Sequence, residues 1–155
     1  GKRAHKHRQA AQEHMEQCRT AIPAWIMPIY RVAESIQPEK DLFDVVIIDE
    51  ASQSGPEALL LLYLAKKIVV VGDDKQISPD NVGLNRNNVD ELRMRYLSNF
   101  QHGDAFGTDN SFFDLADIHY SNRVRLREHF RCMPEIIQFS NNLCYANEPL
   151  IPLRQ

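Results

Sequence analysis

The 155 residues include 18 Lys and Arg against 21 Asp and Glu, for a net charge of −3, and 43% of them are hydrophobic. This composition is typical of a globular domain, and it shows no general excess of basic charge, although a local patch could still bind phosphates. The three cysteines form no Cys-x-x-Cys pair, which indicates neither a zinc site nor a disulfide framework, and we expect a reducing, cytoplasmic setting. No apolar run is long enough to cross a bilayer, so we expect no membrane partner.

The N-terminal part of the chain, residues 1–20, predicts a polar, exposed helix. Basic residues outnumber acidic ones there, which leaves two interpretations open, a solvated face and a basic arm beside nucleic acid. Residues 21–27 could form an extended edge strand, because Pro23 cannot donate a hydrogen bond inside a sheet. Trp25 either packs into a core or stacks on a base. Apolar residues at helical spacing then predict a helix over Ile29–Ile36.

Two predicted strands of apolar residues and the predicted helix between them are the most informative part of the sequence. The β-branched run Val45–Ile48 predicts a strand that is buried on both faces of a parallel sheet. The apolar run Ala58–Ala65 follows a proline suited to a first helical position and predicts a helix, and Ile68–Val71 predicts a second strand. Parallel strands joined by a right-handed crossover end at one edge of a sheet, where ligand sites form. We therefore expect the polar residues that follow the strands to converge at this edge: Asp49, Glu50, Asp73 and Gln76.

The second half of the chain predicts less regular structure. Residues 80–110 predict an insertion or mobile loop with one helix around Val89–Leu97. The last residues, 148–155, predict no closing element. Together the elements predict an α/β fold. Three further elements are expected: a helix capped by Ser111 that runs through Ala116, a short strand over Val124–Leu126, and an amphipathic helix over Pro134–Cys144.

Three segments resemble helicase motifs, and they stand in the order of the family. The sequence Asp49-Glu50-Ala51-Ser52 resembles the Walker B motif of NTPases. The sequence Val71-Gly72-Asp73-Asp74-Lys75-Gln76-Ile77-Ser78-Pro79 resembles motif III of superfamily 1 helicases, Gly-Asp-x-x-Gln-hydrophobic-x-Pro. Residues 126–137 with Phe139, Ser140 and Tyr145 resemble motif IV, except that His129 replaces Asn or Gln and Phe130 replaces the commoner Tyr. Because Ser111-Phe112-Phe113-Asp114 is also similar to a segment of the Upf-like, or 1B, branch, residues 22–149 resemble that branch.

The resemblance implies a role in ATP hydrolysis for each of five residues. Asp49 would hold Mg²⁺ through water, and Glu50 would orient and deprotonate the water that attacks the γ-phosphate. Gln76 would sense the γ-phosphate, Asp73 would support the same loop, and Arg131 would stabilise the charge that develops on the phosphate. Phosphoryl transfer requires positioning and charge neutralisation of this kind. From the residues alone, Asp73 could instead cap its turn, and Arg131 could pair with a surface carboxylate.

The resemblance also implies the later half of a first RecA-like domain, with a partial parallel sheet, flanking helices and no P-loop strand. Within residues 1–155 the parts would be a polar helix (1–20), a Walker B and motif III core (21–79), an insertion (80–110) and a motif IV region (111–155). No Gly-x-x-x-x-Gly-Lys-Ser/Thr pattern occurs, so we expect a piece of a longer protein that binds triphosphate weakly by itself. A missing strand would leave an open sheet edge. We expect either that Val124–Leu126 closes onto Ile68–Val71 or that the chain dimerises through the gap.

The function implied is that of an ATP-dependent helicase or translocase acting on single-stranded DNA or RNA, with ATP and Mg²⁺ as cofactors. A second hypothesis is a non-catalytic, helicase-derived module that serves only as an interaction platform. A third is another class of P-loop NTPase that shares only Walker B, although motif III and the segment around Arg131 argue against it.

Overall fold

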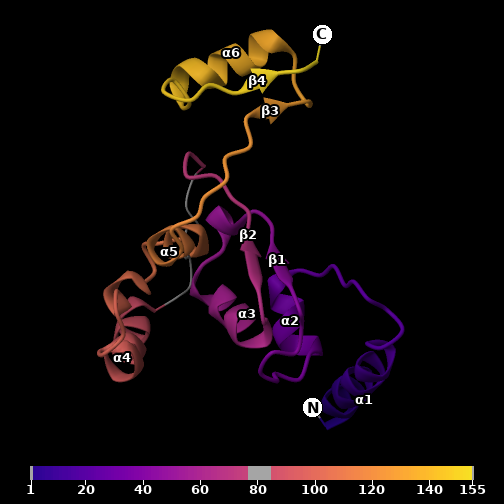
Figure 1. Ribbon diagram of the computed structural model, residues 1–155. Helices are drawn as coiled ribbons and strands as arrows, with labels where there is room; N and C mark the ends of the chain where they lie inside the picture. The colour runs from indigo at the N-terminus through magenta and orange to yellow at the C-terminus, as the bar shows by residue number, and fades with distance from the viewer. Residues whose placement is uncertain (1, 77–84, 155) are drawn as a thin grey trace.

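The computed structural model of the chain describes residues 2–76 and 85–154. Figure 1 shows a central body built around β1 and β2, a smaller unit of β3, α6 and β4 that stands apart from it, and the N-terminal helix α1 on the other side. No helix in these two ranges combines the length and apolar character that a membrane crossing needs. The helices are α1 (Lys2–Cys18), α2 (Ile29–Ser35), α3 (Leu59–Leu64), α4 (Arg86–Leu97), α5 (Phe112–His119) and α6 (Pro134–Leu143); the 3-10 helices are η1 (Ala51–Gln53), η2 (Pro56–Ala58) and η3 (Gly103–Ala105); and the strands are β1 (Val46–Ile48), β2 (Ile68–Val70), β3 (Glu128–His129) and β4 (Ile151–Pro152).

The N-terminal segment is helical at both ends and irregular between them. The helices predicted before residue 20 and after Ile29 are confirmed as α1 and α2. The strand expected over residues 21–27 is wrong, because the described strands pair with one another and none lies beside this segment. The indole of Trp25 is half-buried and donates a hydrogen bond to the carbonyl of Ile22 at 3.0 Å.

A parallel strand pair forms the sheet of the central body. The pair β1 and β2 is in register from Val46 opposite Ile68 to Ile48 opposite Val70. Helix α3 makes the crossover between them, as the β-α-β pattern predicts, and the isolated bridge between Phe43 and Ala65 extends the pairing toward the start of β1. The predicted α/β class with a short parallel sheet is confirmed.

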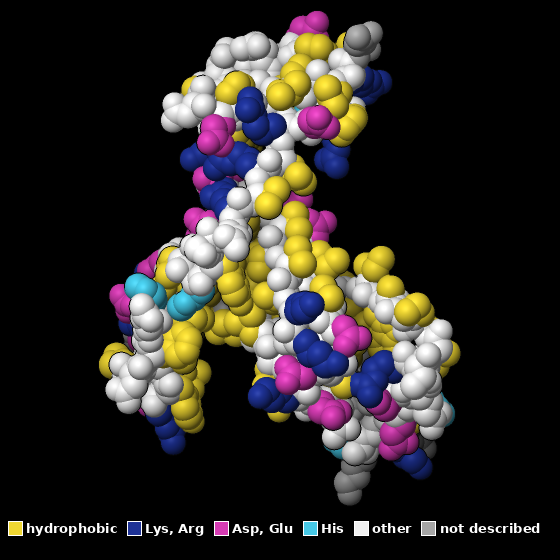
Figure 2. Space-filling view, viewed as in Figure 1, with side chains coloured by type: hydrophobic (Ala, Val, Ile, Leu, Met, Phe, Trp, Pro, Cys, Tyr) yellow, Lys and Arg dark blue, Asp and Glu magenta, His cyan; other side chains and the backbone are white. Residues whose placement is uncertain are grey.

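The expectation that β1 is buried on both faces is wrong. Ile48 is 3% exposed, whereas its neighbour Ile47 is 67% exposed and Val69 on β2 is 46% exposed. Alternate residues of a strand point to opposite faces, so one face packs into the core while the other is open. Hydrophobic side chains are visible over this part of the body in Figure 2.

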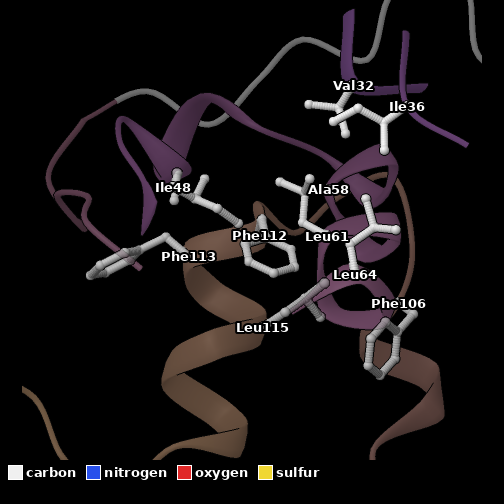
Figure 3. Packing of buried hydrophobic residues seen from close by; sticks show 11 residues of the cluster. Val32, Ile36, Ile48, Ala58, Leu61, Leu64, Phe106, Phe112, Phe113 and Leu115 are labelled. Atoms are coloured by element: carbon white, nitrogen blue, oxygen red, sulfur yellow. The ribbon is translucent and has the colours of Figure 1, made fainter. Parts of the chain in front are cut away.

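The hydrophobic core lies between the packed face of the sheet, α3 and α5. Phe112 is 2% exposed and Leu64 is 1% exposed. Figure 3 shows aromatic and aliphatic side chains gathered between these elements. Helix α5 begins at a capping box, in which Ser111 accepts from the backbone N–H of Asp114 and the Asp114 carboxylate accepts from the backbone N–H of Ser111. The predicted cap at Ser111 is therefore confirmed, and the helix extends three residues beyond Ala116, to His119.

The C-terminal unit differs most from the expectation. Val124–Leu126 is extended but forms no strand, and Val124 is 87% exposed. The strand forms two residues later, as β3, and pairs in parallel with β4, so the prediction of no closing element is also wrong. Closure of Val124–Leu126 onto the second strand of the body is thus contradicted, because β2 pairs with β1 and β3 pairs with β4. The predicted amphipathic helix is confirmed as α6.

Candidate active site

The polar end of β1 is a sharp turn that carries two exposed carboxylates. Ile48 ends the strand in the core, and Asp49 and Glu50 follow it at the surface. Glu50 adopts a left-handed backbone conformation with φ 53° and ψ 40°, which is uncommon for a residue other than glycine. Its backbone N–H donates to Oδ1 of Asp49 at 3.0 Å. This turn directs the chain out of the sheet and into η1.

The loop after β2 is bonded to the segment that follows Glu50. The backbone N–H of Ala51 donates to the carbonyl of Val71 at 2.8 Å, which extends the pairing of the two strands past their ends. The buried hydroxyl of Ser52 accepts from the backbone N–H of Asp73 at 2.8 Å. The structure therefore brings the Walker B and motif III segments together at one sheet edge, where the sequence places them.

Gln76 lies at the same edge, on the far side of the loop. The side-chain amide of Gln53 donates to Oε1 of Gln76 at 3.3 Å, and the backbone N–H of Gln76 donates to the carbonyl of Asp73 at 3.2 Å. The end of motif III, Ile77, Ser78 and Pro79, lies outside the described residues.

Gly72 permits the close packing of this loop. A Cβ atom at this position would lie 2.6 Å from Cδ2 of Phe113 and 2.9 Å from Oγ of Ser52. Both separations are shorter than van der Waals contact, so only glycine fits between α5 and η1 without a shift of its neighbours. Gly72 thus allows Asp73 to reach the Ser52 hydroxyl.

The two carboxylates of the motif III loop are each held by a residue from later in the chain. Oδ2 of Asp73 accepts from the hydroxyl of Tyr145 at 2.5 Å, and Oδ1 of Asp74 accepts from Arg123 at 2.7 Å. Partial burial acts to raise the pKa of Asp74, but the Arg123 guanidinium and the ammonium of Lys75 outweigh it and hold that pKa below its ordinary value. Burial, followed by the hydrogen bond to Asp73, raises the pKa of Tyr145 well above its ordinary value.

The sequence alone indicates no role for Tyr145 or Arg123. Tyr145 was visible only as the last residue of the motif IV resemblance. Arg123 lies in none of the motif segments, and nothing in its neighbours along the chain indicates a partner 49 positions away.

Arg131 stands apart from the other candidate residues. It is exposed in the turn between β3 and α6, and its carbonyl accepts from the guanidinium of Arg154 at 3.2 Å. Among the described residues, no hydrogen bond or ion pair joins its side chain to Asp49, Glu50 or Gln76. The structure therefore does not bring Arg131 to the sheet edge.

His129 has a defined role in the turn that carries Arg131. Its Nε2 accepts a hydrogen bond from the backbone N–H of Cys132 at 3.1 Å. The sequence does not indicate which hydrogen bond His129 makes, and in the structure this bond stabilises the turn itself.

The carboxylates at the sheet edge suit a magnesium ion that is held largely by water. In the described part of the chain, no group of three or more His, Cys, Asp or Glu side chains could enclose a metal ion. Mg²⁺ keeps several of its waters and usually takes one or two carboxylates together with substrate phosphates. The exposed carboxylate of Asp49, at the end of a strand, fits this kind of site.

Comparison with known proteins identifies relatives that are helicases by name. A family model described as an AAA domain matches residues 31–80. The chain is 32% identical over 142 residues to the uncharacterized ATP-dependent helicase MG140 of Mycoplasma genitalium, which covers 88% of this chain and 12% of that protein. It is 34% identical over 110 residues to the DNA replication ATP-dependent helicase/nuclease DNA2 of Homo sapiens, which covers 70% of this chain and 9% of that protein.

A third relative is similar over a shorter stretch. The 5'-3' DNA helicase ZGRF1 of Mus musculus is 31% identical over 106 residues, which covers 66% of this chain and 5% of that protein. The chain thus spans no more than 12% of the length of these relatives. The chain belongs to the Upf-like branch of the superfamily 1 helicases, of which it represents a segment.

Proposed function

We propose that this chain is part of an ATP-dependent motor that unwinds or moves along single-stranded DNA or RNA. The observation that supports this proposal most strongly is the junction of the two strand ends. Ser52, two residues after Glu50, accepts from the backbone N–H of Asp73, and the Gln53 amide donates to Gln76. A nucleotide phosphate at this edge would meet a metal-binding carboxylate and a polar sensor that already share a hydrogen-bond network.

In the proposed mechanism Asp49 and Glu50 divide the work of hydrolysis. Asp49 would hold Mg²⁺ through water, and the ion would supply charge neutralisation at the phosphate oxygens. Glu50 would orient the attacking water and accept its proton. The left-handed backbone conformation of Glu50 changes the direction of the chain between the two carboxylate residues. Such a change suits a site in which one carboxylate serves the metal and the other serves the water.

Gln76 and Arg131 would act on the γ-phosphate from the two sides of the site. Gln76 would sense the phosphate and transmit its presence through Gln53 to η1. Arg131 would reach the phosphate when the β3–α6–β4 unit closes on the body, and its guanidinium would match the geometry of the phosphate oxygens. Arg131 is exposed in the present arrangement, so its side chain is accessible to a ligand.

The 155 residues by themselves are proposed to bind ATP weakly and not to turn it over. They contain no P-loop pattern, and a P-loop supplies the backbone amides and lysine that cradle the phosphates. Dimerisation of the isolated chain through the open edge of the β1–β2 sheet stays a proposal, which size-exclusion chromatography with light scattering tests directly.

Substitution of the proposed base in the full-length protein tests the function. Glu50→Gln keeps the shape of the side chain but cannot accept the proton, so nucleic-acid-stimulated ATP hydrolysis should fall by about 10²–10⁴-fold. Affinity for a non-hydrolysable ATP analogue should stay the same. Glu39→Gln is the matched control, because Glu39 is exposed and lies in none of the motifs.

Two outcomes would count against the proposal. Unchanged turnover in the Glu50→Gln protein would remove Glu50 from the role of base. A full-length protein that binds partners but shows no nucleic-acid-stimulated ATPase activity would instead support the interaction module.

A further inference from the structure

The β3–α6–β4 unit is joined to the central body by an extended segment, residues 120–127. Val124 and Leu126 in this segment are 87% and 80% exposed, so packing does not hold it in place. At its start, Arg123 pairs with Asp74 of the body at 2.7 Å. Beyond that anchor the segment is bonded to the unit and not to the body, because Arg125 pairs with Glu148 and Arg127 donates to the carbonyl of Pro149. A single orientation of the unit therefore requires a further contact with the body.

Tyr145 makes such a contact, across 72 positions of the chain. Its hydroxyl donates to Oδ2 of Asp73 at 2.5 Å, and both side chains are partly buried. The backbone N–H of Tyr145 donates to the carbonyl of Asn141 in α6 at 3.1 Å, so the ring moves with that helix. Burial and the Asp73 carboxylate raise the pKa of the phenol, which keeps the proton that the hydroxyl donates.

Three hydrogen bonds hold Asp73, which is the acceptor of the bond from Tyr145. Oδ1 of Asp73 accepts from the backbone N–H of Lys75 at 2.9 Å, which closes the motif III loop. The backbone N–H of Asp73 donates to Ser52, which follows the Walker B carboxylates. The hydroxyl of Tyr145 occupies the remaining oxygen. Asp73 therefore connects the Walker B segment, the motif III loop and the end of α6 through consecutive hydrogen bonds.

We infer that Tyr145 is a positioning residue that tethers the end of α6 to the Gly72–Gln76 loop and thereby keeps the β3–α6–β4 unit beside Gln76, from where closure of the unit would bring Arg131 to the site. Arg131 belongs to the same unit, in the turn that is stabilised by the hydrogen bond from Cys132 to His129. The inference depends on the proposed function for the roles of Gln76 and Arg131. The mechanical link between the unit and the loop does not depend on it.

Kinetics in the full-length protein test the positioning role. Tyr145→Phe removes only the hydroxyl, and a hydrogen bond to a charged acceptor is strong enough that kcat for nucleic-acid-stimulated ATP hydrolysis should fall about 10-fold. The KM for ATP should change less than about twofold, because the substitution does not remove a contact that binds the nucleotide equally in the ground state and in the transition state. Tyr96→Phe is the control, since Tyr96 is 67% exposed. In the Asp73→Ala background, which lacks the acceptor, Tyr145→Phe should have no further effect.

A distance measurement tests the link without relying on activity. Nitroxide labels at Leu62→Cys in α3 and Asn142→Cys in α6, on a background without other reactive cysteines, report the separation of the body and the unit by pulsed electron paramagnetic resonance. The distance distribution should be narrow in the labelled parent and broad after Tyr145→Phe. The circular dichroism of the two proteins should be the same, because α6 itself stays folded.

The outcomes separate this inference from the proposed function. A broad distribution in the parent, an unchanged distribution after Tyr145→Phe, or broadening without a fall in kcat would each overturn the positioning role. If Glu50→Gln leaves turnover unchanged while Tyr145→Phe still broadens the distribution, the proposed function fails and the link stands. If Glu50→Gln abolishes turnover while Tyr145→Phe changes neither quantity, the inference fails and the function stands.

Discussion

Substitution of Gly72 by alanine should destabilise the chain by steric overlap at the motif III loop. The added Cβ would lie 2.6 Å from the ring of Phe113 and 2.9 Å from Oγ of Ser52. Phe113 is only 9% exposed, so its ring has little room to move. Overpacking of this kind costs about 1–3 kcal/mol. A Gly-to-Ala change also restricts the unfolded chain, which offsets about 0.4–1 kcal/mol of that cost.

Gly107 and Gly103 provide a comparison for the effect of an added Cβ on stability. At Gly107 the added Cβ would meet only Nη1 of Arg93 at 3.6 Å, which is ordinary contact. Gly107→Ala should therefore be neutral or stabilising by less than about 1 kcal/mol. At Gly103 the Cβ would lie 2.3 Å from the backbone carbonyl of Leu97, so Gly103→Ala should be the most destabilising of the three.

Urea denaturation followed by circular dichroism measures all three variants on one scale. The free energy of unfolding should decrease in the order Gly107→Ala, Gly72→Ala, Gly103→Ala, with unchanged m-values. If Gly72→Ala is as stable as Gly107→Ala, the close approach of the loop to α5 is not present in solution. In that case Asp73 does not depend on Gly72 to reach the Ser52 hydroxyl.

Three further predictions concern the helix cap, a buried amide and an ion pair. Ser111→Ala removes the side-chain cap of α5 and should lower the free energy of unfolding by about 1 kcal/mol, measured in urea. Asn141→Leu should cost about 1–3 kcal/mol in the same assay, because the buried amide bonds both backbone groups of Leu150, at 2.8 and 2.9 Å, and leucine would leave them unpaired. The pKa of Asp74 is lowered in the folded state, so its pairing with Arg123 adds stability above the unfolded value near 3.8 and loses it as pH falls through the lower folded value. Asp74→Asn should reduce the acid sensitivity of unfolding below about pH 4 by a small amount, because both partners are 32% exposed and solvent screens the pair.

The elements that could be predicted from the sequence are those determined by local pattern. The β1–α3–β2 unit follows from two β-branched runs, an apolar helix between them and the fixed handedness of the crossover. The cap at Ser111 follows from a short polar side chain placed directly before an apolar helix. In both cases the residues that decide the structure lie within a few positions of the element.

The elements that could not be predicted depend on partners far along the chain. The residues Val124–Leu126 have the β-branched and apolar character of a strand, yet the strand forms at Glu128–His129 because Ile151–Pro152 offers its pairing edge there. The exposure of Ile47 likewise depends on whether another element covers that face of the sheet. A strand sequence reports its own preference and not the presence of its neighbours.

The same distinction separates the candidate site residues. The convergence of Asp49, Asp73 and Gln76 at one edge follows from parallel topology, which the sequence pattern implies. The position of Arg131 depends on how one unit stands against another, and the Tyr145 contact joins residues 72 positions apart. Neither could be found by spacing along the chain. The assignment of roles to these residues stays a prediction until the substitutions above are made.

In the proposed motor, the exposed carboxylates would have to be covered before ATP is hydrolysed. Asp49 and Glu50 both lie at the surface, where water screens their charge and weakens any interaction with a metal or a nucleophile. Phosphoryl transfer gains most from charges that act in a closed, water-excluding site. The unit that holds Arg131 contacts the motif III loop at this edge through the Tyr145–Asp73 hydrogen bond. We therefore expect hydrolysis to depend on closure of this unit, so that a nucleic acid that favours the closed arrangement would accelerate turnover without adding a chemical group to the site.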